Sequence, residues 1–169
     1  ADHIGTYDSK DSFERFYPFI TSIKGIRIAF LNYTYGTNGF TPHSPLIVNY
    51  IDEEKIKKDI FRAKTLSADL IVACLHWGDE YQLLPNKRQE DLADFLAKEG
   101  VQLIIGAHPH VIQPMELRYD EQGNPCALIV YSLGNFISNM KTRDTVGGAM
   151  VKVVIRRDIT GKILLQSAQ

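Results

Sequence analysis

The chain has 169 residues, of which 44% are hydrophobic and 23% charged, and its formal net charge is −1. This length fits one globular domain with a sizeable core, and we expect a single domain over residues 1–169. The balance of 19 basic against 20 acidic residues, without a basic stripe, excludes nucleic acid as an expected partner. The first residue is not methionine, and we interpret the sequence as a chain that lost a leader or as a piece of a longer protein.

Four strands are predicted, in chain order. Residues 25–34 alternate and are rich in β-branched and aromatic side chains. Residues 68–76, 101–108 and 127–135 are nearly continuous apolar runs, a pattern typical of strands that are buried on both faces. Parallel sheets require such strands, so these runs favour a parallel arrangement.

Two helices are expected between these strands. Residues 52–68 carry apolar side chains at three- and four-residue steps, and Asp52 is the expected N-cap. Residues 86–100 show a second apolar stripe, with Gly100 at the position of a C′ glycine. The connection over 34–52 is longer than usual, which is typical of a functional or mobile loop.

The C-terminal part predicts a hairpin. Residues 147–158 and 161–167 alternate, and the intervening "DITG" has the composition of a turn. The complete order of elements predicts an α/β fold: a largely parallel sheet with crossover helices and an antiparallel C-terminal edge.

Polar side chains follow the predicted apolar strands. His76 ends one run, His108 ends the next, and Asn135 ends the third. Ligands of open α/β sheets bind beyond the carboxyl ends of the strands. We therefore expect these three side chains, together with His110, on one rim of the sheet.

The segment "GAHPH" places two imidazoles on either side of Pro109. Proline favours an extended conformation for His108, so we expect the rings of His108 and His110 to face one pocket. Neutral imidazole is a common ligand of zinc, manganese and iron. The alternative is a polar turn whose rings form local hydrogen bonds. Gly106 is expected to let the backbone pass close to a neighbour or a ligand.

The segment "HWGDEY" adds an aromatic ring and two carboxylates beside His76. Trp77 is expected to pack rather than react. Asp79 and Glu80 either orient a histidine or hold substrate, or are simply solvated at the surface.

In combination, "HWGDEY" (76–81), "GAHPHVIQP" (106–114) and "YSLGNF" (131–136) resemble the bacterial capsule-biosynthesis CapA family. The resemblance covers about residues 26–140. That family is associated with poly-γ-glutamate synthesis and with the calcineurin-like metallophosphatase superfamily. The resemblance implies a two-sheet α/β sandwich with two metal ions at the strand ends.

The same resemblance implies a role for each matched residue. His76 and His108 would serve one divalent metal (Mn, Zn or Fe) and His110 the other. Glu80 matches the acidic position after "HWG", and Asn135 matches the asparagine that closes the pocket, so both are candidate catalytic residues. Such a metal pair clamps a phosphoryl oxygen and generates a hydroxide nucleophile.

The early motifs of the superfamily, Asp-x-His, Gly-Asp and Asn-His, should lie upstream of the first predicted strand, and none of them occurs in that part of this sequence. The resemblance therefore implies that the chain is the C-terminal half of a longer protein. We expect two metals in the full-length protein, at most one in this piece, and no catalysis by this piece alone. A sheet that lacks its upstream strands has an uncovered edge, through which copies can associate.

Two functions follow from these expectations. The first is a metal-dependent hydrolase of capsule biosynthesis, acting on a phosphoester or on an anionic envelope polymer. The alternative is a non-catalytic binding or scaffold subunit of a capsule-polymer synthesis or export assembly. The family resemblance further implies an extracytoplasmic, membrane-anchored protein of the cell envelope, with membrane-bound capsule synthesis subunits as partners.

Overall fold

A computed structural model describes residues 3–168. The chain divides into two compact units, Ala1–His76 and Trp77–Gln169, each of which is described by itself. The single domain expected from chain length stays a prediction. None of the helices within residues 3–168 is long and apolar enough to cross a membrane.

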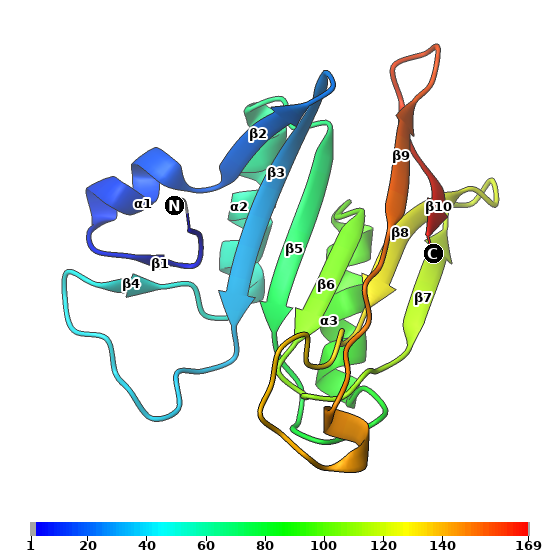
Figure 1. The fold of residues 1–169 in the computed structure, drawn as a ribbon. Helices are drawn as coiled ribbons and strands as arrows, with labels where there is room; N and C mark the ends of the chain where they lie inside the picture. Colours follow the sequence, from blue (N-terminus) through cyan, green and yellow to red (C-terminus); the bar gives the residue numbers. More distant parts are fainter. Residues whose placement is uncertain (1–2, 169) are drawn as a thin grey trace. The chain divides into compact units, whose positions relative to one another are not determined.

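The sheet of the first unit contains β2 (Phe19–Ile23), β3 (Ile26–Thr34) and β5 (Leu70–His76). Strands β2 and β3 form an antiparallel hairpin, and β3 pairs in parallel with β5 from Ile28↔Leu70 to Thr34↔His76. Helix α2 (Glu53–Thr65) connects β3 to β5 and lies against these two strands (Figure 1). The predicted strands 25–34 and 68–76 and their crossover helix are therefore confirmed.

Helix α2 begins and packs as the sequence predicts. The Asp52 side chain accepts a hydrogen bond of 2.8 Å from the Lys55 backbone N–H, which caps the helix. Ile56, Ile60 and Ala63 are buried on one face. The predicted stripe continues one step too far, because residue 66 is the C-cap, outside the last helical turn, and its leucine side chain is 44% exposed.

Strand β2 was not expected from the sequence, and neither were three further short elements of the first unit. They are β1 (Thr6–Tyr7), α1 (Lys10–Phe16) and β4 (Ile47–Val48). Strands β1 and β4 pair antiparallel, so part of the long connection 34–52 is held in a two-stranded sheet.

A buried polar pair lies between β3 and α2. Tyr33 is fully buried, and its hydroxyl donates a hydrogen bond of 2.8 Å to the Asp59 carboxylate. Burial raises the pKa of Asp59, an effect opposed by the Tyr33 hydrogen bond and by Lys55 and Arg62. The carboxylate therefore sits where its charged form is disfavoured.

The sheet of the second unit contains β6 (Leu103–Ala107), β7 (Met115–Tyr119) and β8 (Pro125–Val130). Strands β6 and β8 are parallel, and β7 is antiparallel to β8. The third predicted run therefore begins slightly earlier than 127 and ends as a strand at Val130, five residues before Asn135. Each unit combines a parallel strand pair with an antiparallel outer strand, which confirms the predicted α/β class.

The C-terminal hairpin is present, although its place in the fold differs from the expectation. Strands β9 (Val153–Arg157) and β10 (Ile163–Ala168) pair antiparallel around a turn in which the Gly161 N–H donates to the Asp158 carbonyl at 3.1 Å. They form a two-stranded sheet of their own. The edge strand that pairs antiparallel with β8 is β7, so the hairpin does not form that edge of the sheet.

Helix α3 (Lys87–Lys98) confirms the second predicted helix. Asn86 and Gln89 form a capping box at its start, and Leu92 and Leu96 are buried. Gly100 follows the helix with φ of 90°, the left-handed conformation predicted for a C′ glycine.

Candidate functional site

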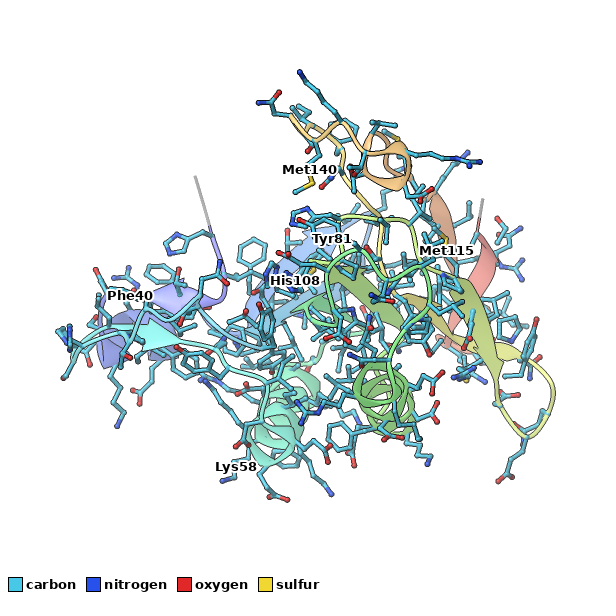
Figure 2. All side chains as sticks on the ribbon, turned by 90° about the horizontal axis from the view of Figure 1, so that it is seen from below. Phe40, Lys58, Tyr81, His108, Met115 and Met140 are labelled. Carbon is cyan, nitrogen blue, oxygen red and sulfur yellow. The ribbon has the colours of Figure 1, made fainter. Side chains whose placement is uncertain are left out.

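The candidate site of the second unit lies at the carboxyl end of β6, where the chain enters the His-Pro-His segment. Figure 2 is seen from below and labels His108 and Tyr81 at this end. A Cβ added at Gly106 would lie 2.0 Å from the Tyr131 carbonyl oxygen and 2.3 Å from the Trp77 indole nitrogen. Only glycine permits this approach, so the predicted close passage at Gly106 is confirmed, and its neighbours are Tyr131 and Trp77.

Trp77 packs beneath the site. Its side chain is 2% exposed, and its indole N–H donates a hydrogen bond of 2.8 Å to the Tyr131 carbonyl. The two rings are stacked, with centroids 5.9 Å apart. Trp77 therefore packs and makes one buried hydrogen bond, as predicted for an aromatic residue beside a site.

The His-Pro-His segment turns, and the expectation of an extended segment is wrong. His108 has φ of 104° and His110 has φ of 61°, both in the region that favours glycine. Tertiary hydrogen bonds outweigh the local bias of proline, since the Tyr81 N–H donates to the Pro109 carbonyl at 2.8 Å and the Trp77 N–H donates to the carbonyl before His108 at 3.1 Å. The two imidazoles are nevertheless neighbours, with ring centroids 6.2 Å apart.

The ring of His110 is oriented by Asn135. His110 Nδ1 lies 2.9 Å from Asn135 Oδ1, and Asn135 Nδ2 donates to the Thr145 carbonyl at 3.0 Å. Because the Asn135 amide nitrogen is engaged by a carbonyl, its oxygen faces His110 and accepts the Nδ1 hydrogen. The neutral ring therefore carries its lone pair on Nε2.

His110 Nε2 lies 3.8 Å from Glu80 Oε1. Both groups are partly exposed, and a positive charge between the lone pair and the carboxylate would be attracted to both. That charge is either a proton on Nε2 or a bound cation. The pair His110–Glu80, oriented by Asn135, is thus a natural place for a cation.

Burial lowers the pKa of His108, and the carboxylate of Glu80 opposes that effect. His108 is therefore neutral at neutral pH, and neutral imidazole is the form that binds a metal. Its donor chemistry fits the predicted role.

Tyr81 is a part of the site that sequence reasoning missed. Its ring is stacked on His110 with centroids 6.0 Å apart and an interplanar angle of 22°. Its φ of 65° is also positive. An aromatic residue in a polar loop gives no local signal of such a contact, which arises because the Tyr81 N–H is bound to Pro109.

His76 belongs to the first unit, where it ends β5 and is exposed. Its ring is stacked on Tyr35, with centroids 5.8 Å apart and an interplanar angle of 8°. Its role as a fellow ligand stays a prediction. Asp79, in the second unit, accepts a hydrogen bond of 2.7 Å from the Asn86 amide, which assigns it to the start of α3.

Within residues 3–168, no group of three or more His, Cys, Asp or Glu side chains is gathered closely enough to hold a metal ion. His108, His110 and Glu80 are nitrogen and oxygen donors of the kind that zinc, manganese and iron bind. Their chemistry therefore fits a divalent cation, while their spacing does not form a complete ligand set.

Two buried glutamines join the loops around the site, and both were missed from sequence. Gln89 Nε2 donates to Gln113 Oε1 at 2.9 Å, and Gln113 Nε2 donates to the carbonyls of Gln82 and Leu84 at 2.9 and 3.1 Å. Gln89 also accepts from the Asn86 N–H at 3.0 Å. The Asn-x-x-Gln spacing signals the cap, whereas no local pattern signals the partner of Gln113.

The fold is shared with solved nucleotidases of the metallophosphatase type. NAD nucleotidase of Haemophilus influenzae matches 97% of this chain with a TM-score of 0.55 at 12% identity. A 5′-nucleotidase precursor of Thermus thermophilus matches 98% with a TM-score of 0.53 at 15% identity. In each case the chain covers 32% of the solved chain. The fold is thus metallophosphatase-like, as the sequence resemblance implied.

Residues 1–140 match the family model described as bacterial capsule synthesis protein PGA_cap, and the chain belongs to this family. It is 32% identical over 151 residues to the PGA biosynthesis protein CapA of Bacillus subtilis (strain 168), covering 83% of this chain and 36% of that protein. It is 33% identical over 144 residues to the capsule biosynthesis protein CapA of Bacillus anthracis, covering 80% and 33%. The family match and these identities confirm the resemblance to the CapA family. The chain spans about a third of the length of these relatives.

Proposed function

We propose that the whole protein is a metal-dependent hydrolase of capsule biosynthesis and that this chain contributes histidine ligands to its site. The observation that carries the proposal is the fixed ring of His110. Asn135 engages Nδ1 at 2.9 Å and leaves Nε2 at 3.8 Å from the Glu80 carboxylate, a pair of donors that a cation would suit. Orientation of a ligating histidine through its second nitrogen is a general feature of metal sites.

Each candidate site residue of the second unit has a role in this proposal. His108 and His110 would hold the cation (Mn, Zn or Fe) through neutral nitrogens, and Asn135 keeps His110 in the ligating tautomer. The cation, when bound, supplies polarisation of a phosphoryl or carbonyl oxygen and a hydroxide near neutral pH. Glu80, half-exposed beside His110, would accept a proton from attacking water. The contribution of His76 is part of the proposal and rests on the sequence alone.

The substrate, partners and location belong to the same proposal. We expect a phosphoester or an anionic capsule polymer as substrate, and membrane-bound capsule synthesis subunits as partners. The family membership supports a role in the cell envelope, and we propose that the full-length protein is membrane-anchored and extracytoplasmic. Association of copies through a sheet edge, such as that of β7, is a further expectation.

The proposal is tested by the metal content of the full-length protein. Asn135→Ala should weaken metal affinity about tenfold or more, because the ring of His110 loses its orienting partner. His110→Ala should remove the metal and the hydrolase activity together. The matched controls are Asn139→Ala and His43→Ala, which change exposed residues of the same types. The measurement is elemental analysis combined with a metal titration.

Unchanged metal content in His110→Ala would refute the proposal. A protein that binds capsule polymer without metal, and retains this binding in His76→Ala and His110→Ala, would instead be the scaffold subunit considered above.

A further inference from the structure

A cavity of about 420 Å³ lies in the second unit beside the candidate site. Its walls are Tyr81, Val111 and the segment 140–145. This segment follows β8 and lies below the strand ends in Figure 1, drawn in orange. A volume of this size is within the range that binds small molecules or a short piece of a polymer.

The cavity adjoins the His110–Asn135 pair on two sides. Tyr81 lines the cavity and is stacked on the His110 ring. On the other side, Asn135 Nδ2 donates to the Thr145 carbonyl at 3.0 Å and contacts Met140 Sδ at 3.5 Å. Both of these residues line the cavity, so the side chain that orients His110 also holds the cavity wall. A ligand in the cavity therefore lies next to His110.

The wall segment carries more positive than negative charge. Lys141 and Arg143 are exposed and line the cavity, together with the single carboxylate of Asp144. Within residues 3–168, neither Lys141 nor Arg143 forms an ion pair with an acid. Both cations are thus available to a ligand.

The backbone of this segment is fixed by its own hydrogen bonds. Residues 143–145 form a single 3₁₀ turn, and the Thr145 N–H donates to the Thr142 carbonyl at 3.0 Å. The hydroxyls of Thr142 and Thr145 are 2.7 Å apart. Because Thr145 is buried and bonded to both Asn135 and Thr142, the exposed Arg143 lies in an anchored turn, and the exposed Lys141 comes directly before the N-cap of that turn.

We propose that this cavity binds a carboxylate or phosphate group of the substrate and that Lys141 and Arg143 determine this specificity. The inference rests on the proposed function, since it assigns the cavity to the substrate of the same site. Arginine binds both kinds of oxyanion through two parallel hydrogen bonds, and lysine adds a second positive charge. Asp144 opposes the anion and limits its affinity.

The test is anion binding by the full-length protein after removal of metal with a chelator. Two probes are titrated separately by calorimetry: a γ-linked glutamate oligomer, which supplies carboxylates, and inorganic phosphate. The double variant Lys141→Ala/Arg143→Ala should weaken binding of the preferred probe about tenfold or more. Asp144→Asn should tighten it severalfold. The matched control is Lys152→Ala/Arg156→Ala, which removes two exposed cations of the same unit outside the cavity.

Preference for the oligomer identifies a carboxylate ligand, and preference for phosphate identifies a phosphate ligand; either result supports the proposal. Equal losses in the two double variants, or no effect of Asp144→Asn, would overturn it. Because binding is measured without metal, failure of the metal-site proposal leaves this result interpretable. Metal content unchanged by Lys141→Ala/Arg143→Ala separates the two proposals further.

Discussion

His108 holds a backbone conformation that side chains rarely adopt. Its φ of 104° is further from the allowed left-handed region than the φ of 61° of His110 or 65° of Tyr81. Such conformations cost about 1–3 kcal/mol each and persist only where the surrounding structure imposes them. Three such conformations in two adjoining loops indicate that contacts between the loops, rather than local backbone preference, fix the positions of these rings.

The strain at His108 predicts an unusual order of stabilities. The free energy of unfolding of the His108→Gly variant should be about 1 kcal/mol larger than that of the His108→Ala variant, because glycine adopts positive φ without penalty. The measurement is urea unfolding of the two variants. At the exposed helical position Arg88 the order should be reversed, since glycine is about 1 kcal/mol worse than alanine within a helix. Equal stabilities of the two His108 variants would contradict the strain.

At this scale, sequence reasoning identifies residue types better than conformations. The neighbouring positions of His108 and His110 are predicted correctly, but from an incorrect backbone. Proline rules describe a local bias, and the hydrogen bond from Tyr81 to Pro109 comes from a loop that lies about 28 residues earlier in the chain. No local rule includes such a contact.

Among the elements, α2 carries a carboxylate whose burial has a measurable consequence. Burial raises the pKa of Asp59 above its ordinary value, so its contribution to stability is complete at pH below the ordinary carboxyl pKa and is lost as pH rises through the raised one. The native protein should therefore lose stability from this group as the pH rises above the ordinary carboxyl pKa of about 4. Asp59→Asn should abolish that loss.

A second variant defines the cause of this pH dependence. The Tyr33 hydrogen bond lowers the pKa of Asp59, so Tyr33→Phe should move the loss of stability to higher pH. The measurement is thermal unfolding at a series of pH values. Parallel profiles of the native protein and Asp59→Asn would show that the carboxylate does not titrate in this window.

Elements with a strong period are those that the sequence predicts. Helices α2 and α3 and strands β3, β5 and β6 have clear apolar patterns and are recovered with small errors at their ends, whereas β8 is recovered but ends five residues before the predicted run does. Strand β7 was missed because its residues are alternately exposed and half-buried, which leaves no apolar run. The two-residue strands β1 and β4 are too short for any periodic pattern.

For the whole molecule, the central fact is that this chain spans about a third of its CapA relatives. We expect the full-length protein to bind two divalent metal ions and the 169-residue chain at most one. The reason is that His108, His110 and Glu80 do not form a complete ligand set within the described residues. Metal-to-protein ratios of both proteins, measured by mass spectrometry after equilibration with manganese or zinc, test this expectation. Two metals on the short chain would contradict it.

The sequence thus predicts the donor residues of the candidate site, but it does not predict the residues that pack against them or join their loops. His110, Glu80 and Asn135 were identified from motifs, because their residue types and order carry the family resemblance. The ring of Tyr81 and the amides of Gln89 and Gln113 were not, since their roles depend on loops that only the folded chain brings together.

The buried amides of Gln89 and Gln113 have a consequence for motion. One connects the start of α3 to the turn after His110, and the other continues to the carbonyls just beyond Glu80. Neither loop can open without breaking this chain of amides, whose two glutamine side chains are buried, so both loops should open in a single cooperative step. Their backbone amides would then exchange with deuterium at one common rate, and the carboxylate and the imidazole would be either both in position or both displaced.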